Sequence, residues 1–220
     1  LPRVAESLRA PISSIRSYHD LLTRGDGLES EQLGRFLERI DANLSRMQVM
    51  LGNLAAIGEL DAAGDPELRP VDASRLLRRA AELAAPQLAE KGLRLDLDIA
   101  PAVPKALAEP EAVERIVDNL LVNAVVRSPH GGDIRATLKP VGSDGGGLYV
   151  VLSVRDRGRV PCEAAGTVLE VDEGDEASVA MRLVRLLAIR QGGRAWVDAD
   201  AVGAAFHVRL PAAPEGSAEV

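Results

Sequence analysis

The sequence predicts an α+β protein in which a helical hairpin precedes an α/β sandwich. Up to about residue 60, apolar residues recur every three or four positions, the period of helices that bury one face. Beyond residue 66, alternating strand patterns are interspersed with helical patterns, which is typical of helices packed on one side of a mixed sheet. The breaker cluster at residues 61–66 separates the two parts. We therefore expect domains at residues 1–62 and 63–212 and a disordered tail at 213–220.

The hairpin prediction depends on two amphipathic helices between about Pro2 and Leu60. In the first, one face carries Leu8, Ile12, Ile15, His19 and Leu22. In the second, apolar residues step by four and three as a heptad seam: Leu33, Leu37, Ile40, Leu44, Met47, Leu51 and Leu54. A turn-like Gly-Asp-Gly at 25–27 joins the helices. Because an isolated hairpin would expose this stripe, we expect a homodimer that forms a four-helix bundle.

The second domain is predicted from three helices and five strands. Asp72 is placed to cap the first helix, Pro110 to begin the second, and Gly192 to end a third that starts near Ser178. The strands are expected at residues 93–99, 133–139, 148–155, 195–199 and 204–210. These elements together predict the sandwich.

Composition excludes several functional classes. A net charge of −7 argues against nucleic-acid binding, which requires a basic face. One cysteine, Cys162, excludes an intrachain disulfide framework and fits a reducing, cytoplasmic location. No apolar run approaches the ~20 residues of a membrane span. Since the sequence does not start with Met, we expect a fragment whose upstream sensor or anchor lies outside it.

Several motifs resemble those of sensor histidine kinases of two-component systems. Residues 8–12, Leu-Arg-Ala-Pro-Ile, resemble the dimerisation helix in which a His-Glu-Leu-Arg-Thr-Pro-Leu run carries the phosphoacceptor. Residues 119–124 match the asparagine box of the ATP-binding domain, 154–158 resemble its first glycine box, and 191–193 match the end of the second. The resemblance covers nearly the whole chain and implies a histidine kinase ATPase-type sandwich.

Compared with the motif of this family, the acceptor site of this chain lacks the reactive groups. Glu6 occupies the acceptor position, Ser7 replaces the orienting acid, and Ala10 stands where a Thr or Asn often positions water. A carboxylate cannot act as the imidazole nucleophile, so no catalytic residue is predicted. Glu6 is either an exposed helix residue or an imitation of the phosphorylated acceptor. His19 is expected to face the bundle, so it offers no substitute.

The resemblance implies a partly preserved nucleotide site. Asn123 would ligate Mg²⁺ with Asn119 beside it, Asp156 would accept from the adenine amine, and Gly158 would let the backbone approach the base. Arg159 replaces the next glycine of the first box, which crowds the pocket. Two residues align with the phosphate-binding glycines of the second box, Ser178 and Ala180, and the phenylalanine box is absent. The four preserved residues are therefore expected to be vestigial, serving as ordinary hydrogen-bonding groups or retaining weak nucleotide binding.

The negative charge of one loop also disfavours ATP binding. The loop that would close over the triphosphate carries no Lys or Arg but six acids: Glu163, Glu170, Asp172, Glu173, Asp175 and Glu176. Each carboxylate near the phosphates costs on the order of 1 kcal/mol. We therefore expect no cofactor, with ATP and Mg²⁺ bound only if the chain is a divergent kinase.

The helix face beside the acceptor position retains its interaction residues. With Glu6 at 0°, Arg9, Ser13 and Arg16 lie within about 80° of it. In the resembled family a response-regulator receiver domain docks here, and the two arginines suit its acidic pocket. A solvated polar face is the alternative. We expect a degenerate histidine kinase-like protein that binds a receiver domain or another kinase; a divergent ATP-binding kinase and a histidine-phosphotransfer-like protein are the alternatives.

Overall fold

The computed structural model describes residues 2–24, 30–143, 146–158, 176–199 and 203–214. The chain divides into two compact units, the first built mainly from residues 1–62 and the second from residues 63–170 and 181–220. Among the helices within these described ranges, none combines the length and the apolar character that crossing a membrane requires.

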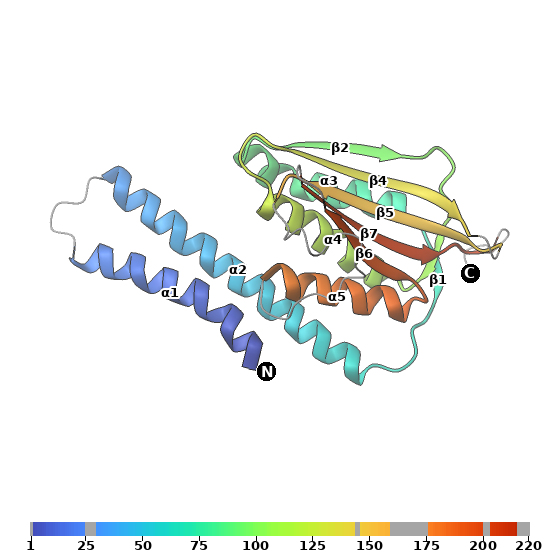
Figure 1. Ribbon diagram of the computed structural model, residues 1–220, viewed down its shortest axis with the longest axis horizontal. Helices are drawn as coiled ribbons and strands as arrows, with labels where there is room; N and C mark the ends of the chain where they lie inside the picture. The colour runs from blue at the N-terminus through green and yellow to red at the C-terminus, as the bar shows by residue number, and fades with distance from the viewer. Residues whose placement is uncertain (1, 25–29, 144–145, 159–175, 200–202, 215–220) are drawn as a thin grey trace. The chain divides into compact units, whose positions relative to one another are not determined.

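The first unit is a hairpin of two long helices, α1 (Pro2–Arg24) and α2 (Ser30–Ala62), which lie antiparallel (Figure 1). The ring centroids of Tyr18 and Phe36 are 5.6 Å apart across the pair. Nearby, the Asn43 amide nitrogen lies 3.4 Å from the Ser14 hydroxyl, to which it donates. Both predicted helices are present, whereas the expected turn at 25–27 lies outside the described residues.

The heptad seam of α2 is only partly covered within one hairpin. Ile40, Met47 and Leu54 are half-buried. The remaining seam residues are 43–51% exposed: Leu33, Leu37, Leu44 and Leu51. Ile12 of α1 is 49% exposed as well. A single hairpin therefore presents a stripe of large apolar side chains to solvent.

His19 lies outside the contact between α1 and α2 within one hairpin. Its side chain is 67% exposed, and its Nδ1 atom lies 3.7 Å from Asp20 Oδ1. The face of α1 that contacts α2 includes Ser14 and Tyr18 instead. Tyr18 is one position before His19, which is about 100° round the helix. Within one hairpin, α1 therefore contacts α2 through Ser14 and Tyr18, while Ile12 and His19 remain exposed. The placement of His19 against a second hairpin stays a prediction.

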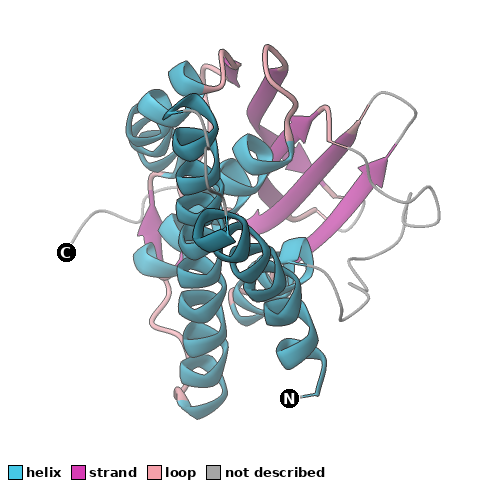
Figure 2. Ribbon diagram, turned by 90° about the vertical axis from the view of Figure 1, so that its left-hand side faces the viewer, coloured by secondary structure: helices cyan, strands magenta, loops and turns pink. Residues whose placement is uncertain are grey.

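The second unit contains a five-stranded sheet in the order β2-β4-β5-β7-β6. β2 pairs parallel with β4, and all other neighbours are antiparallel. The strands are β2 (Arg94–Ile99), β4 (Asp133–Gly142), β5 (Leu148–Asp156), β6 (Arg194–Ala199) and β7 (Ala204–Pro211). Figure 2 shows them as one magenta layer. One face is covered by α3 (Ala73–Glu90), α4 (Pro110–Arg127) and α5 (Glu176–Arg190) (Figure 1). The predicted mixed sheet with helices on one side is confirmed.

A small second sheet was not predicted. β1 (Arg69–Val71) pairs antiparallel with β3 (Ala106–Ala108). Each strand has three residues, which is too short for an alternating pattern to be recognised.

Polar side chains fix the ends of the helices. Asp72 Oδ1 accepts from the Arg75 N–H at 3.0 Å, as a helix N-cap does. Glu109, which precedes Pro110, makes no side-chain cap. Instead the fully buried Gln191 accepts the Glu109 N–H at 2.9 Å, so the residue after α5 anchors the start of α4.

The core lies between the helices and the sheet. α4 contributes the largest set of buried residues and packs against β5, and β4, β5 and β7 all contribute buried residues to the core. The largest fully buried side chains include Leu77, Val113, Ile116, Leu120, Leu121, Ile134, Leu138 and Val154. With few aromatic residues, aliphatic side chains fill this space, as the composition predicts.

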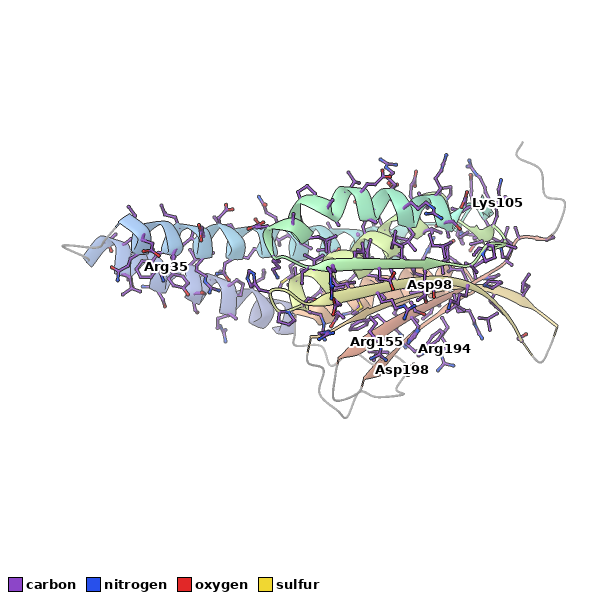
Figure 3. The ribbon with its side chains drawn as sticks, turned by 90° about the horizontal axis from the view of Figure 1, so that it is seen from above. Arg35, Asp98, Lys105, Arg155, Arg194 and Asp198 are labelled. Carbon is purple, nitrogen blue, oxygen red and sulfur yellow. The ribbon has the colours of Figure 1, made fainter. Side chains whose placement is uncertain are left out.

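The opposite face of the sheet carries charged side chains, among them Asp98, Arg155 and Asp198 (Figure 3). Asp98 accepts from Lys139 Nζ at 2.9 Å, and that hydrogen bond is the main cause lowering the pKa of Asp98. Trp196 stacks on His207 with ring centroids 4.9 Å apart. The imidazole Nδ1 of His207 lies 2.7 Å from the Ser153 hydroxyl. Side chains of neighbouring strands therefore contact one another along this face.

Candidate functional site

The four residues expected at the nucleotide site lie on two neighbouring elements. Asn119 and Asn123 are one turn apart on α4, while Asp156 ends β5 and Gly158 follows it. α4 packs against β5, which brings the end of the helix to the end of the strand.

Asp156 is the buried acid of this site. The residue is 1% exposed, and both carboxylate oxygens are engaged. Oδ1 accepts the backbone N–H of Gly158 at 2.6 Å, and Oδ2 accepts Nε of Arg127 at 3.1 Å. A carboxylate buried to this degree requires such partners, because unpaired burial of a charge is costly.

The partner of Asp156, Arg127, is the last residue of α4. Its side chain is only 15% exposed, so the ion pair is shielded from water on both sides. The guanidinium carbon also lies 5.2 Å from the centroid of the Phe206 ring, within the range of a cation–π contact. Arg127 therefore occupies a space bounded by a carboxylate and an aromatic ring.

Burial and neighbouring groups shift the pKa of Asp156 in opposite directions. Burial raises the pKa of its carboxyl group, while the Arg127 guanidinium and the Gly158 N–H lower it. Burial is the larger influence, so the pKa is raised. Among the neighbouring groups, the Arg127 guanidinium has the largest effect in lowering this pKa.

Gly158 is required by close packing rather than by backbone conformation. A Cβ at this position would lie 2.7 Å from Arg127 Cβ and 2.8 Å from Asp156 Oδ1. Both distances are shorter than ordinary contacts, so any larger residue would displace the ion pair.

The two asparagines are in different environments. The side-chain amide of Asn119 donates to the Arg115 carbonyl at 2.8 Å, along its own helix. Asn123 is 8% exposed, and its buried Nδ2 finds no hydrogen-bond partner within the described ranges. Such an orphaned amide is uncommon in a folded protein.

These observations test whether ATP and Mg²⁺ fit. If Asp156 recognised a base as the resemblance implies, the base would donate to Oδ2, and in this arrangement Oδ2 already accepts from Arg127. No group of three or more His, Cys, Asp or Glu side chains able to hold a metal ion occurs in the part of the chain that the structure describes. Two asparagine side chains do not supply enough oxygen ligands for Mg²⁺. The ion would therefore also need ligands from the phosphates of the nucleotide.

Several sequence expectations fall outside the described residues. Arg159 and the loop acids from Glu163 to Asp175 lie in the undescribed range 159–175, and the side chains of Glu176 and Ser178 are also not described. Ala180 lies within α5 and is half-buried.

The expected interaction face of α1 is partly described. Arg9, Ser13 and Arg16 are all exposed. Glu6 belongs to the same helix, but its side chain is outside the described set.

Arg127 is the site residue that the sequence analysis missed. The sequence contains a spacing that could have indicated it: Asn119, Asn123 and Arg127 follow one another at intervals of four residues. That spacing places all three on one helix face. A cation at the end of a helix is common, however, so the spacing alone did not identify a partner for Asp156.

Comparisons with known proteins agree with this fold. Residues 108–214 match the family of histidine kinase-, DNA gyrase B-, and HSP90-like ATPases. Sensor protein CreC of Escherichia coli is 30% identical over 168 residues, which are 76% of this chain and 34% of CreC. The chain therefore spans about a third of this relative's length.

Two solved structures share the fold. The structure of histidine kinase ThkA in complex with response regulator protein TrrA aligns with a TM-score of 0.72 and 19% identity, covering 98% of this chain and 61% of that one. Full-length ShkA in complex with AMPPNP aligns with a TM-score of 0.63 and 24% identity, covering 94% and 47%. The chain therefore contains a histidine kinase-like ATPase domain at residues 108–214, and its homologues include sensor histidine kinases.

Proposed function

We propose that this chain is a catalytically degenerate histidine kinase-like signalling protein. It acts by dimerising and by binding a response-regulator receiver domain or another kinase, without phosphorylating itself. The observation that carries the proposal is the pairing of Asp156 with Arg127, because it occupies the carboxylate that would recognise adenine.

The acceptor position supports the same conclusion independently. Glu6 stands where the resemblance places the phosphoacceptor histidine. A carboxylate lacks the imidazole nitrogen that attacks the γ-phosphate, so the acceptor position lacks its nucleophile.

The binding surface is the exposed face of α1. Arg9 and Arg16 are exposed cations on a chain of net charge −7. Their charge complements the acidic pocket that receiver domains present, and the related fold of ThkA is found in complex with a response regulator. Binding is therefore expected to weaken with rising salt.

Autophosphorylation is the direct test. We expect no transfer of label from γ-labelled ATP with Mg²⁺ to this chain, and none to a Glu6→His variant, because restoring the nucleophile leaves Asp156 paired. An active sensor kinase assayed in parallel controls the reagents. Labelling of the wild-type chain would refute the proposal, and labelling of Glu6→His alone would show that only the acceptor is degenerate.

Nucleotide binding is tested separately by calorimetry. We expect no heat on titration with millimolar ATP, with or without Mg²⁺. Micromolar binding that is lost in Asn123→Ala would show that the site still works, since that substitution removes the buried amide.

Dimerisation is predicted from the exposed stripe of α2. Leu37 is 51% and Leu44 47% exposed in a single hairpin, and both belong to the heptad seam. Leu37→Glu/Leu44→Glu is expected to convert a dimer into a monomer, because two charges per hairpin would be buried unpaired in a bundle. Light scattering after size-exclusion chromatography measures the mass. Ser45→Glu, an exposed position on the same helix, is the control and remains dimeric; a monomeric wild-type chain would contradict the prediction.

A divergent sensor histidine kinase that still binds ATP is the second candidate. The buried Nδ2 of Asn123, which finds no hydrogen-bond partner among the residues that the structure describes, favours it, since a bound ligand would satisfy this atom. ShkA, which shares the fold, is found in complex with AMPPNP. The calorimetric titration distinguishes this candidate from the first.

A histidine-phosphotransfer-like protein is the third candidate, and the exposure of His19 favours it. Such a protein requires an accessible histidine on the bundle. His19 follows the exposed Ile12 by seven residues, which places both on one side of α1. A dimer that covers Ile12 would therefore cover His19 as well, which is why we favour the first candidate.

A further inference from the structure

We infer that Arg127 is an intramolecular occupant of the nucleobase pocket, and that this one side chain keeps an otherwise formed adenine site closed. The inference rests on the proposed function and explains how its nucleotide site is inactivated. The ligand class is the one that the resemblance implies, a planar base that donates an N–H to Asp156; the new element is that Arg127 takes its place.

The guanidinium has the chemical features of such a ligand. It is planar, and its N–H groups donate to carboxylates. Here Nε donates to Asp156 Oδ2 at 3.1 Å, and the group lies 5.2 Å from the centre of the Phe206 ring. An amino-purine would make the same two contacts, a donated hydrogen bond and a contact with an aromatic ring.

The remainder of the pocket does not depend on Arg127. Asp156 Oδ1 is held by the Gly158 N–H at 2.6 Å, so the carboxylate keeps its orientation when Oδ2 is released. Phe206 is fixed in β7, which pairs with β5 on one side and β6 on the other. Removal of the guanidinium therefore leaves an acceptor and a ring in place.

An external base cannot compete with this occupant. Arg127 is part of α4, so its effective concentration at Asp156 is in the millimolar range or above. Its hydrogen bond is also charge-assisted, whereas the adenine amine is a neutral donor. The wild-type site is therefore closed to nucleosides at ordinary concentrations.

Adenosine is the appropriate probe, because it carries the amino-purine without phosphates and therefore tests the base site alone. The variants are Arg127→Ala and Arg127→Gln; the second retains a neutral amide donor and a longer stem in case the alanine variant does not fold. Arg115→Ala is the matched control, since it removes the same charge from an exposed position on α4. Saturation-transfer NMR and calorimetry measure binding, with circular dichroism as the check of folding.

We expect Arg127→Ala or Arg127→Gln to bind adenosine at least tenfold more tightly than the wild-type chain or Arg115→Ala. We expect guanosine to bind less well, and binding to be lost in Arg127→Ala/Asp156→Asn. Folded Arg127 variants that bind no adenosine would overturn the inference. So would wild-type binding as tight as theirs, or binding that survives loss of the Asp156 charge.

The two proposals fail in different experiments. Self-phosphorylation of the wild-type chain refutes the proposed function. Absence of adenosine binding by folded Arg127 variants refutes only the role of Arg127 as the occupant, and leaves a degenerate protein whose pocket is closed by something else.

Discussion

Arg127→Ala is expected to lower the free energy of unfolding by about 3 kcal/mol at neutral pH. Breaking a buried ion pair by removing one partner leaves the other charge uncompensated, which costs about 3–5 kcal/mol. The Asp156 side chain is fully buried and Arg127 is 15% exposed, so the lower part of that range applies. Urea unfolding followed by circular dichroism measures the change. Arg115→Ala, the exposed control on α4, is expected to change stability by less than about 0.5 kcal/mol.

The loss of stability in Arg127→Ala should depend on pH in a defined direction. Burial raises the folded-state pKa of Asp156, and removal of the guanidinium raises it further. A carboxyl whose folded-state pKa is above its unfolded value favours folding when protonated, so stability falls as pH rises through the folded-state pKa. The destabilisation of Arg127→Ala is therefore largest at neutral pH and shrinks as the solution is acidified toward the unfolded-state pKa. A loss that does not change with pH would exclude the buried charge as its cause. Arg127→Ala/Asp156→Asn should recover most of the loss.

Gly193→Ala is expected to destabilise the protein by about 3 kcal/mol, because the added methyl group overlaps fixed backbone. Its Cβ would lie 2.1 Å from the Arg209 carbonyl oxygen and 3.0 Å from that of Ala188. Rotation of a side chain cannot relieve either overlap, so α5 and β7 would have to separate at this point.

Gly142→Ala is the matched control for this effect. No atom lies within 4 Å of a Cβ built at Gly142, so its stability should change by less than about 0.5 kcal/mol. Thermal unfolding of both variants measures the difference. Equal melting temperatures for the two would mean that β7 accommodates the methyl group without cost.

The sequence was sufficient to predict the elements that have a clear period or a cap. α4 begins at Pro110, α3 is capped by Asp72, and the five long strands lie within two or three residues of the expected positions. These features are local, because each depends on residues close together in the chain. β1 and β3 were missed because each is short and is stabilised by pairing with a distant segment.

The candidate site was predictable only in part, for a related reason. Asn119, Asn123, Asp156 and Gly158 could be located by motif. The partner of Asp156 is 29 residues earlier in the chain, and no local pattern links it to that acid. The contact of Ser14 and Tyr18 with α2 was missed as well, because the apolar period of α1 does not include these two residues.

The stacking of Trp196 on His207 gives the protein an internal spectroscopic probe. Trp196 is the only tryptophan in the chain, and its ring lies 4.9 Å from the imidazole on the sheet face opposite the helices. Intrinsic fluorescence excited at the indole band therefore reports on this face alone. A partner that covers the sheet would change the emission, whereas one that binds α1 would change binding heat or mass while leaving the emission as it was. One optical measurement thus separates two modes of association without a label.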